Sequence, residues 1–564
     1  MGKKLFIAEK PSVAQEFAKA MKLNMSRKDG YLESDEAIVT WCVGHLVTMS
    51  YPDAYDEKYK KWSLDTIPFI PETFRYEVIP SVKKQFSIVS SLLNREDVDC
   101  IYVCTDSGRE GEYIYRLVEQ EANVQGKQRK RVWIDSQTEE EILRGIREAK
   151  DESEYDALSD AAYLRAKEDY LMGINFSRAL TLKYSYPVKT YLNQDKCVIS
   201  VGRVMTCVLG MVVSREREIR AFTKTPFYRV ISKMPMGDSF VEGEWRVSPG
   251  SKYEQSPKLY KENGFLKEED AKEFIDFLKA EPKEPMVVDS IEKKKEVKNP
   301  PLLYNLAELQ NDCSKLFKIS PDETLNIIQE LYEKKLCTYP RTDARVLSSA
   351  VAKEINKNIN GLTNYGLCSG FAKQILQGES WKKIGKTKYT NDKLITDHYA
   401  IIPTGQGLQA LNSLHPTAQK VYEIIVRRFL SIFMDPAEYQ KISLVTLLKG
   451  ERFYASFKAL KNEGYLAVTK YSFIKPKTVK SEEQAGNDVT SAATADGEKT
   501  SENGSGEEAE DQSLDESMLE AISDLKKGAE CKVDDFVIKS GETSPPKRYN
   551  SGSMILAMEN AGQL

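Results

Sequence analysis

The sequence predicts a multidomain fold in which an N-terminal α/β domain is followed by separate α-helical and β-rich regions. Three observations predict it. The chain has 564 residues, which is too many for a single hydrophobic core. Residues 1–152 alternate short apolar runs with amphipathic stretches, as a mostly parallel sheet covered by helices would. Further along, the sequence changes from helical periodicity to strand alternation, back to helical periodicity, and then to strand alternation again.

The α/β segment contains three strand patterns, each followed by a helix pattern. The strands are predicted at residues 4–8, 98–104 and 131–134. Thr138 occupies the N-cap position of the helix that follows the third strand. This repeated strand-helix order predicts parallel pairing of the strands.

Three carboxylates belong to the turns after these strands. Glu9 directly follows the first strand, Asp106 comes just after the second, and Glu110 opens a helix predicted from about residue 109 to 122. Because the carboxyl ends of parallel strands meet at one edge of a sheet, we expect the three side chains to gather there. Such a cluster could bind Mg2+ and would raise the pKa of at least one member, which could then donate a proton. The structural alternative is a solvated acidic helix start favoured by the helix dipole.

The rest of the chain divides by composition and hydrophobic period. The Asn299-Pro300-Pro301 break and the return of strand alternation near Ile442 make the central helical region an insertion into the β-rich one. The predicted segments are a helical 153–222, a β-rich 223–298, a helical 299–440, a β-rich return at 441–480, an acidic disordered 481–520, and a 521–564 segment that ends the β-rich region and starts a returning helical one.

Charge and cysteine content narrow the class of protein. Residues 481–520 hold thirteen acidic residues and one basic residue, Lys499, which gives this segment a net charge of −12. Because the whole chain has a net charge of −4, the other 524 residues have a net charge of +8. A mildly basic folded part permits a nucleic-acid partner. The nine cysteines form no CxxC pair, so neither a zinc ribbon nor a disulfide framework is predicted. Without a long apolar run, we expect a cytoplasmic protein with no membrane association.

The hexapeptide Thr338-Tyr339-Pro340-Arg341-Thr342-Asp343 is the most specific short motif. A tyrosine oxygen can attack a phosphodiester, and the resulting phosphotyrosine conserves the bond energy for the reverse reaction. Arg341, two residues on, could clamp the phosphate and stabilise its developing charge. A partly buried tyrosine beside a proline turn is the structural alternative.

Several segments together resemble the type IA DNA topoisomerases, in the topoisomerase III branch. The resemblance is carried in order along the chain by two acidic motifs similar to those of the TOPRIM fold, a DNA-contacting helical motif, a nucleophile motif and a histidine motif. They lie at residues 6–12, 105–112, 200–206 with 215–219, 339–343 and 397–404.

The resemblance implies a role for each matching residue. Tyr339 would be the nucleophile that forms a 5′-phosphotyrosine, and Arg341 would position the scissile phosphate. Glu9 would be a general acid or metal ligand, Lys10 would contact that phosphate, and His398 would contact DNA and assist proton movement. The other implied sites are the Mg2+ ligands Asp106 and Glu110 and the single-strand groove residues Arg165, Asp169, Arg178, Ser200 and Arg203.

The implied enzyme is a toroid with a gate that breaks one DNA strand, passes another strand and reseals the break. It would relax negative supercoils or decatenate, act on single-stranded or underwound DNA, and work as a monomer. ATP would not be required, because the phosphotyrosine conserves energy and the sequence has no GxxxxGK[ST] loop.

Three positions depart from the family pattern. Gly108 replaces the middle Asp of Asp-x-Asp-x-Glu, which leaves fewer metal ligands. Tyr399 stands where a second histidine is common. The chain stops at Leu564 before a Gly-x-Gly-Thr-Pro segment, as expected of a truncated or short form.

Two rival functions remain open from the sequence. One is a TOPRIM nuclease or primase-like enzyme, in which metal-activated water attacks and Tyr339 is structural. The other is a non-catalytic remnant that only binds single-stranded DNA, which Gly108 and the abrupt ending make plausible.

Overall fold

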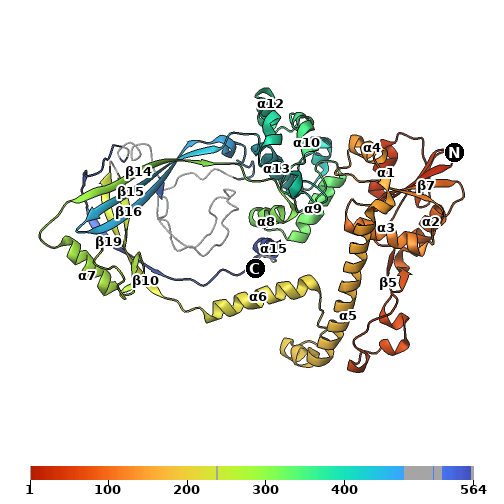
Figure 1. Ribbon diagram of the computed structural model, residues 1–564, viewed down its shortest axis with the longest axis horizontal. Helices are drawn as coiled ribbons and strands as arrows, with labels where there is room; N and C mark the ends of the chain where they lie inside the picture. Colours follow the sequence, from red (N-terminus) through yellow and green to blue (C-terminus); the bar gives the residue numbers. More distant parts are fainter. Residues whose placement is uncertain (1, 237–238, 475–511, 514–521, 523, 560–564) are drawn as a thin grey trace. The chain divides into compact units, whose positions relative to one another are not determined.

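The computed structural model describes residues 2–236, 239–474, 512–513, 522 and 524–559 (Figure 1). The predicted disordered segment 481–520 therefore lies outside the described residues, except for Gln512 and Ser513.

The chain divides into two compact units, each built from segments far apart in the sequence. Unit 1 comprises Met1–Val212, Leu302–Phe429 and Asn550–Leu564, and unit 2 comprises Val213–Pro301 and Leu430–Tyr549. None of the helices in the described part of the chain is long and apolar enough to cross a membrane.

The N-terminal part of unit 1 is built on a seven-stranded sheet in the order β2-β3-β4-β1-β7-β8-β9. Its four central strands, β4, β1, β7 and β8, pair in parallel, while the strands at both edges are antiparallel. The strands are β1 (Lys3–Ala8), β2 (Ser26–Lys28), β3 (Tyr31–Glu33), β4 (Ala37–Trp41), β7 (Val98–Cys104), β8 (Gln128–Arg131) and β9 (Lys150–Asp151), with β5 (Val47–Met49) and β6 (Tyr76–Val78) forming a separate pair.

Helices cover both faces of this sheet because successive strand residues point to opposite sides. Leu5 and Ile7 of β1 pack with α2 (Lys83–Leu93) and α3 (Arg109–Glu121), whereas Phe6 and Ala8 pack with α1 (Pro11–Ala20) and α4 (Glu139–Arg147). Each fully buried aliphatic or aromatic side chain contributes roughly 1.5–3 kcal/mol. These two cores fix the sheet edge at which β1 and β7 end.

The predicted elements of this part match the structure except at the third strand. The second strand, helix α3 and the Thr138 N-cap lie where predicted, the Thr138 side chain accepting from the Glu141 amide. The strand predicted at 131–134 is wrong, because β8 ends at Arg131. The Ile134 amide donates to the Ser107 hydroxyl at 2.9 Å, so the chain leaves the sheet to meet the turn after β7.

Two long helices follow, α5 (Asp156–Leu192) and α6 (Arg203–Ala221). α5 lies beside α3, and Ala162 of α5 belongs to the core under α2 and α3 (Figure 1).

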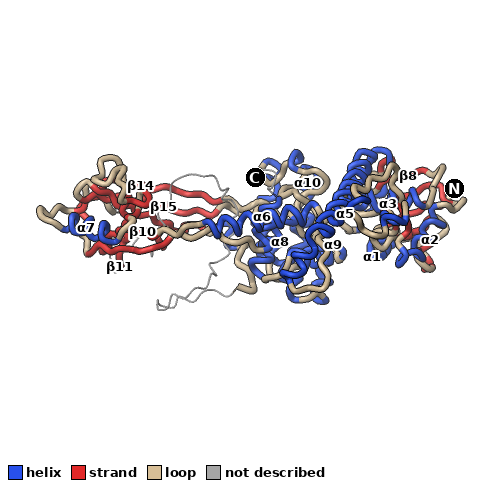
Figure 2. Tube along the Cα trace, turned by 90° about the horizontal axis from the view of Figure 1, so that it is seen from below, coloured by secondary structure: helices blue, strands red, loops and turns tan. Residues whose placement is uncertain are grey.

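The 302–431 region is almost entirely helix and loop, as Figure 2 shows. The C-terminal helix α15 (Ser551–Glu559) packs on α8 (Leu306–Phe317), where Gly552 lies against Asn311 with no room for a Cβ. The other helices are α9 (Pro321–Glu333), α10 (Ser349–Glu354), α11 (Asn356–Leu362), α12 (Ser369–Gln377) and α13 (Pro416–Ser431).

The described part of unit 2 contains a ten-stranded sheet, and α7 (Glu268–Lys279) packs on it. β14 pairs with β15 from Val287↔Leu447 to Lys298↔Ala437, so strands on both sides of the helical insertion share one sheet. The strands are β10 (Pro226–Met236), β11 (Ser239–Arg246), β12 (Leu259–Lys261), β13 (Gly264–Phe265), β14 (Met286–Lys298), β15 (Ala437–Leu448), β16 (Glu451–Asn462), β17 (Gln512–Ser513), β18 (Glu530–Cys531) and β19 (Asp535–Glu542).

Short 3-10 helices connect these elements. They are η1 (Pro52–Ala54), η2 (Glu57–Tyr59), η3 (Leu64–Thr66), η4 (Pro80–Val82), η5 (Glu152–Tyr155), η6 (Ser380–Lys386), η7 (Asp392–Leu394), η8 (Leu408–Ser413) and η9 (Gly464–Ala467).

Candidate active site

The segment that carries Tyr339 is held against the segment that carries the histidine motif. The Thr338 amide donates to the Ile402 carbonyl at 3.0 Å, and the Ile402 amide donates to the Thr338 hydroxyl at 3.0 Å. The Thr342 hydroxyl donates to the His398 carbonyl at 2.8 Å. These bonds on either side of Tyr339 fix its backbone, and its side chain is buried.

Tyr339 also contacts the carboxyl edge of the N-terminal sheet. Its backbone amide donates to the Asp135 carbonyl at 2.9 Å. Burial raises the pKa of the Tyr339 phenol, Asp106 and Glu9 raise it further, and Arg341 opposes them. The phenol is therefore neutral, and it lies within electrostatic reach of two carboxylates and one guanidinium.

Glu9 and Asp106 meet because β1 and β7 pair in parallel, with Ala8 opposite Cys104. Both side chains are buried. Burial raises the pKa of Glu9 to about 7, with a further contribution from Asp106, against the opposing charge of Lys10. Burial likewise raises the pKa of Asp106, although Lys10 and Arg341 counteract it. Glu9 can therefore carry a proton near neutral pH.

Arg131 holds the turn that presents Asp106. Its guanidinium donates to the Thr105 carbonyl at 2.8 Å and to the Asp106 carbonyl at 2.7 Å. Its other side faces Glu112, 3.0 Å away, and both side chains are fully buried. Since a buried cation requires partners, this arrangement makes the turn part of the rigid core.

Glu110 does not join Glu9 and Asp106, in contrast to the expectation that the three carboxylates gather. Its carboxylate lies 2.7 Å from the imidazole of His45, and this contact, more than burial, sets its lowered pKa. Glu110 is an exposed residue in the first turn of α3, and its carboxylate pairs with His45. Within the described residues, no group of three or more His, Cys, Asp or Glu side chains is arranged to hold a metal ion.

His398 bridges Tyr339 and the TOPRIM-like motif. Its Nδ1 atom lies 2.6 Å from the Asp135 carboxylate, and its Nε2 atom bonds the Ser107 carbonyl. Its ring stacks on Trp133 and lies 4.5 Å from the Tyr339 ring, centroid to centroid. Burial opposes the charged ring, but Asp135 and the Ser107 carbonyl outweigh it and raise the pKa of His398. Because both partners are acceptors, both ring nitrogens donate and His398 is an imidazolium.

Four of the five predicted groove residues lie on α5, in the segment that precedes α6, and at the start of α6. The Val201 amide donates to the Ser177 hydroxyl at 2.8 Å, which holds the segment before α6 against α5. The Arg203 guanidinium lies 2.6 Å from the Asp169 carboxylate, and both side chains are about half exposed. The exposed members of this groove cluster are Arg165, Asp169, Ser200 and Arg203.

Arg178 differs from the expectation that it lines an open groove. Its side chain is buried, with its guanidinium over the Trp62 ring at 5.4 Å, and burial lowers its pKa. The 50–75 segment packs on this part of α5 and covers it, as the bonds between Asn175 and the Phe69 backbone show.

Comparisons with known proteins identify the family of this chain. Residues 153–510 match the DNA topoisomerase family, and residues 4–136 match the Toprim domain. The chain is 33% identical to DNA topoisomerase 3 of Bacillus subtilis over 563 residues, which cover 99% of this chain and 67% of that protein. It is 34% identical to DNA topoisomerase 3 of Bacillus licheniformis over 561 residues, with the same coverage. This chain belongs to the type IA DNA topoisomerase family.

The fold of a type IA topoisomerase is confirmed by a solved structure. Full-length topoisomerase I from Thermotoga maritima matches with a TM-score of 0.60 and 20% identity, over 99% of this chain and 75% of that one. The predicted combination of a TOPRIM α/β domain with helical and β-rich regions is thus correct. The rival nuclease and remnant readings are not favoured, because the family match extends through Tyr339 and His398.

The Toprim domain is a metal-binding fold, and two carboxylates of this type IA topoisomerase fit a hard cation. Glu9 Oε2 and Asp106 Oδ2 are buried atoms without a hydrogen-bond partner. A buried carboxylate oxygen normally has a partner, and a divalent cation would supply one. Gly108 adds no ligand, but a Cβ at that position would meet no atom within 4 Å.

Sequence reasoning missed three residues of the site, namely Asp135, Ser107 and Arg131. Asp135 follows the third predicted strand pattern, so the rule that selected Glu9 and Asp106 could have selected it. Ser107 contributes its carbonyl and hydroxyl, and a backbone carbonyl leaves no mark in a sequence. Arg131 was included in a strand pattern and carried no sign that its guanidinium is buried.

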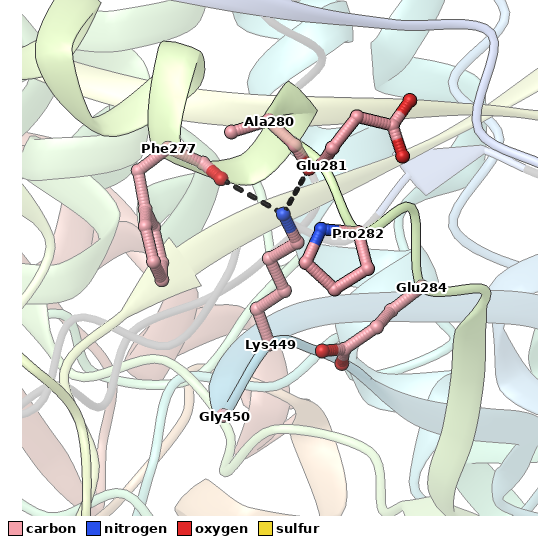
Figure 3. Close-up of a pocket in the computed structure, with 7 residues that line it drawn as sticks. All are labelled: Phe277, Ala280, Glu281, Pro282, Glu284, Lys449 and Gly450. Carbon is pink, nitrogen blue, oxygen red and sulfur yellow. Dashed lines mark hydrogen bonds between the residues drawn. The ribbon is translucent and has the colours of Figure 1, made fainter.

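A pocket in unit 2 is separate from these residues. It is lined by Phe277, Ala280, Glu281, Pro282, Glu284, Lys449 and Gly450 (Figure 3). The Lys449 ammonium donates to the carbonyls of Phe277 and Ala280 at the end of α7. Lys449 therefore caps a helix, which is a structural role.

Proposed function

We propose that this type IA topoisomerase cuts one DNA strand through Tyr339, holds the 5′ end as a phosphotyrosine, and reseals the strand after another has passed. The observation that carries the proposal is the 2.9 Å bond from the Tyr339 amide to Asp135, which keeps the phenol at the edge where Glu9 and Asp106 end. A phenol at this edge can reach a phosphate that cations hold there.

The proposed cleavage step forms one bond and breaks one. The Tyr339 oxygen attacks phosphorus, its proton leaves to solvent, and the bond from phosphorus to the 3′ oxygen breaks. Glu9, whose pKa of about 7 leaves it partly protonated, donates a proton to the departing 3′ oxygen. In resealing, the 3′ hydroxyl returns the proton to Glu9 and displaces the phenolate, which takes up a proton from solvent. No net bond energy is lost, so ATP is not needed.

Arg341, Lys10 and His398 would provide positive charge around the phosphate. Arg341 lowers the pKa of the Tyr339 phenol, which favours its ionisation during attack. Lys10 and Arg341 both oppose the rise in the pKa of Asp106, so both positive charges lie near this carboxylate. The His398 imidazolium adds a third cation beside the Tyr339 ring.

We infer that Mg2+ binds at Asp106, with Glu9 as a ligand when it carries no proton and Glu110 as a ligand once it leaves His45. When bound, Mg2+ would neutralise these carboxylates and stabilise negative charge on the phosphate. The unpartnered oxygens of Glu9 and Asp106 support this site.

The groove cluster would bind single-stranded or underwound DNA, chiefly through phosphate charge, so that binding weakens with salt. In this proposal, residues 1–152 and 299–440 cleave the DNA strand. Residues 153–222 bind the single strand, and residues 223–298 and 441–480 form a hinge. We further propose a cytoplasmic monomer that relaxes negative supercoils or decatenates.

The test is plasmid relaxation by a Tyr339→Phe variant against a Tyr422→Phe control. Tyr422 is a buried tyrosine of α13 outside the site, so its variant should relax negatively supercoiled plasmid normally. Tyr339→Phe should bind single-stranded DNA but lose both relaxation and the denaturant-stable covalent adduct. Retained DNA cleavage by Tyr339→Phe would contradict the proposal and favour attack by water.

A further inference from the structure

Lys10 makes an ion pair with Glu333 at the junction of the TOPRIM part and the Tyr339 segment. The Lys10 ammonium lies 3.0 Å from Glu333 Oε1, and both side chains are about one-third exposed. The same oxygen accepts from the Gln329 side chain at 3.1 Å. Glu333 is the last residue of α9, on the segment that leads into Tyr339, and Lys10 directly precedes α1. The pair therefore joins the two parts that the proposed reaction brings to one phosphate.

The negative charge of Glu333 reaches the candidate active site. Burial is the main cause of the raised pKa of Asp106, Lys10 and Arg341 counteract it, and Glu333 adds to it. The Glu333 carboxylate is thus paired with Lys10 and is also close enough to Asp106 to act on its charge. A phosphate bound to Lys10 would add a second anion beside this carboxylate. Two anions close to one ammonium repel each other, so one of them must give way.

We propose that Glu333 is an internal stand-in for a DNA phosphate: its carboxylate holds Lys10 in the DNA-free enzyme and is displaced when the scissile phosphate binds. The inference rests on the proposed function, in which Lys10 contacts that phosphate. Glu333 is a positioning residue, because it acts through Lys10 and does not touch the reacting atoms.

This exchange would have a consequence for the junction. Displacement removes one tie between the TOPRIM part and the Tyr339 segment as DNA enters. Two other ties, Glu16 with Lys335 and Glu140 with Lys357, do not involve Lys10 and would remain. DNA binding would therefore loosen the junction only beside the scissile phosphate.

The test is the affinity of the metal-free protein for a labelled single-stranded oligonucleotide of mixed sequence, measured by fluorescence anisotropy in EDTA. Glu333→Gln removes the competing charge and should bind roughly two- to fivefold more tightly, the range expected for a partly exposed ion pair. Glu330→Gln, which removes the same charge from an exposed position of α9, is the matched control and should leave the affinity unchanged.

The double-mutant cycle with Lys10 separates a competitor from a general charge effect. Lys10→Gln should weaken binding, and adding Glu333→Gln to it should give no gain. A gain that persists without Lys10, or no gain from Glu333→Gln alone, would overturn the inference. Unchanged binding by Lys10→Gln would instead contradict the phosphate contact assigned to Lys10, and the stand-in role with it.

Thermal unfolding of each variant checks that the fold is kept. If Glu333→Gln does not fold, Glu333→Asp withdraws the carboxylate by one methylene and should give a smaller gain in affinity. No gain from a folded Glu333→Asp would then overturn the stand-in role.

Discussion

The Nδ1 atom of His398 lies 2.6 Å from the carboxylate of Asp135, across the junction between the helical region and the TOPRIM sheet. The other ring nitrogen bonds the Ser107 carbonyl, next to Asp106. One imidazolium therefore connects the segment that carries the histidine motif with the turns after β7 and β8. The ring can donate both hydrogen bonds only when both of its nitrogens are protonated, so this contact depends on pH.

Replacing Asp135 by Asn should destabilise the protein in a pH-dependent way. A histidine whose pKa is raised by folding stabilises the fold fully below its unfolded pKa, and this contribution is lost as pH rises through the folded pKa. At about pH 6 we expect Asp135→Asn to cost about 1.5–3 kcal/mol, the usual contribution of a hydrogen bond to a charged group. The cost should shrink by about pH 9. Chemical unfolding at both pH values measures it, and a pH-independent difference would argue against the imidazolium.

Replacing Gly108 by Asp should strengthen Mg2+ binding without loss of stability. The backbone at Gly108 is extended, with φ 178°, and a Cβ there meets no atom within 4 Å. An Asp would also occupy the N-cap of α3, a favoured position for it. Titration calorimetry should show tighter Mg2+ binding for Gly108→Asp, whereas Gly108→Asn, of similar size and capping ability but uncharged, should not bind more tightly. Equal binding by both variants would speak against a ligand at this position.

Replacing Arg131 by Met should lower the free energy of unfolding by about 3–5 kcal/mol, because it leaves the fully buried Glu112 with one partner fewer. It should also free the Asp106 turn, whose carbonyl Arg131 holds. Denaturant unfolding measures the loss. The double variant Glu112→Leu with Arg131→Met should recover part of it, since no unpaired buried charge remains. A loss below about 1 kcal/mol would mean that the network contributes little.

Replacing Arg203 by Ala should weaken binding of single-stranded DNA and reduce the slope of log affinity against log salt by about 1. The Asp169 carboxylate lies 2.6 Å from the same guanidinium and competes with DNA for it. Asp169→Asn should therefore strengthen the binding of single-stranded DNA. Arg178→Ala should instead lower stability, because that side chain is buried over Trp62. If Arg203→Ala leaves the salt dependence of binding unchanged, Arg203 does not contact the DNA phosphates.

The sequence predicted the parts of the fold and site that depend on local patterns. The strand at 98–104 and the helix opened by Arg109 follow from apolar periodicity, and the rule for parallel strands brought Glu9 and Asp106 together. Glu110 could not be placed, because its orientation depends on His45, which lies far away in the sequence. The burial of Arg178 likewise depends on packing by the 50–75 segment.

The attachment of DNA to the protein tests the central claim most directly. After incubation with single-stranded DNA and Mg2+, denaturation and digestion by protease and nuclease, mass spectrometry identifies the peptide that carries the nucleotide. We predict that the nucleotide is joined through its 5′ phosphate to Tyr339, in the peptide that contains Tyr339-Pro340-Arg341. Attachment to another residue, or no attachment by an enzyme that still cleaves DNA, would contradict the mechanism.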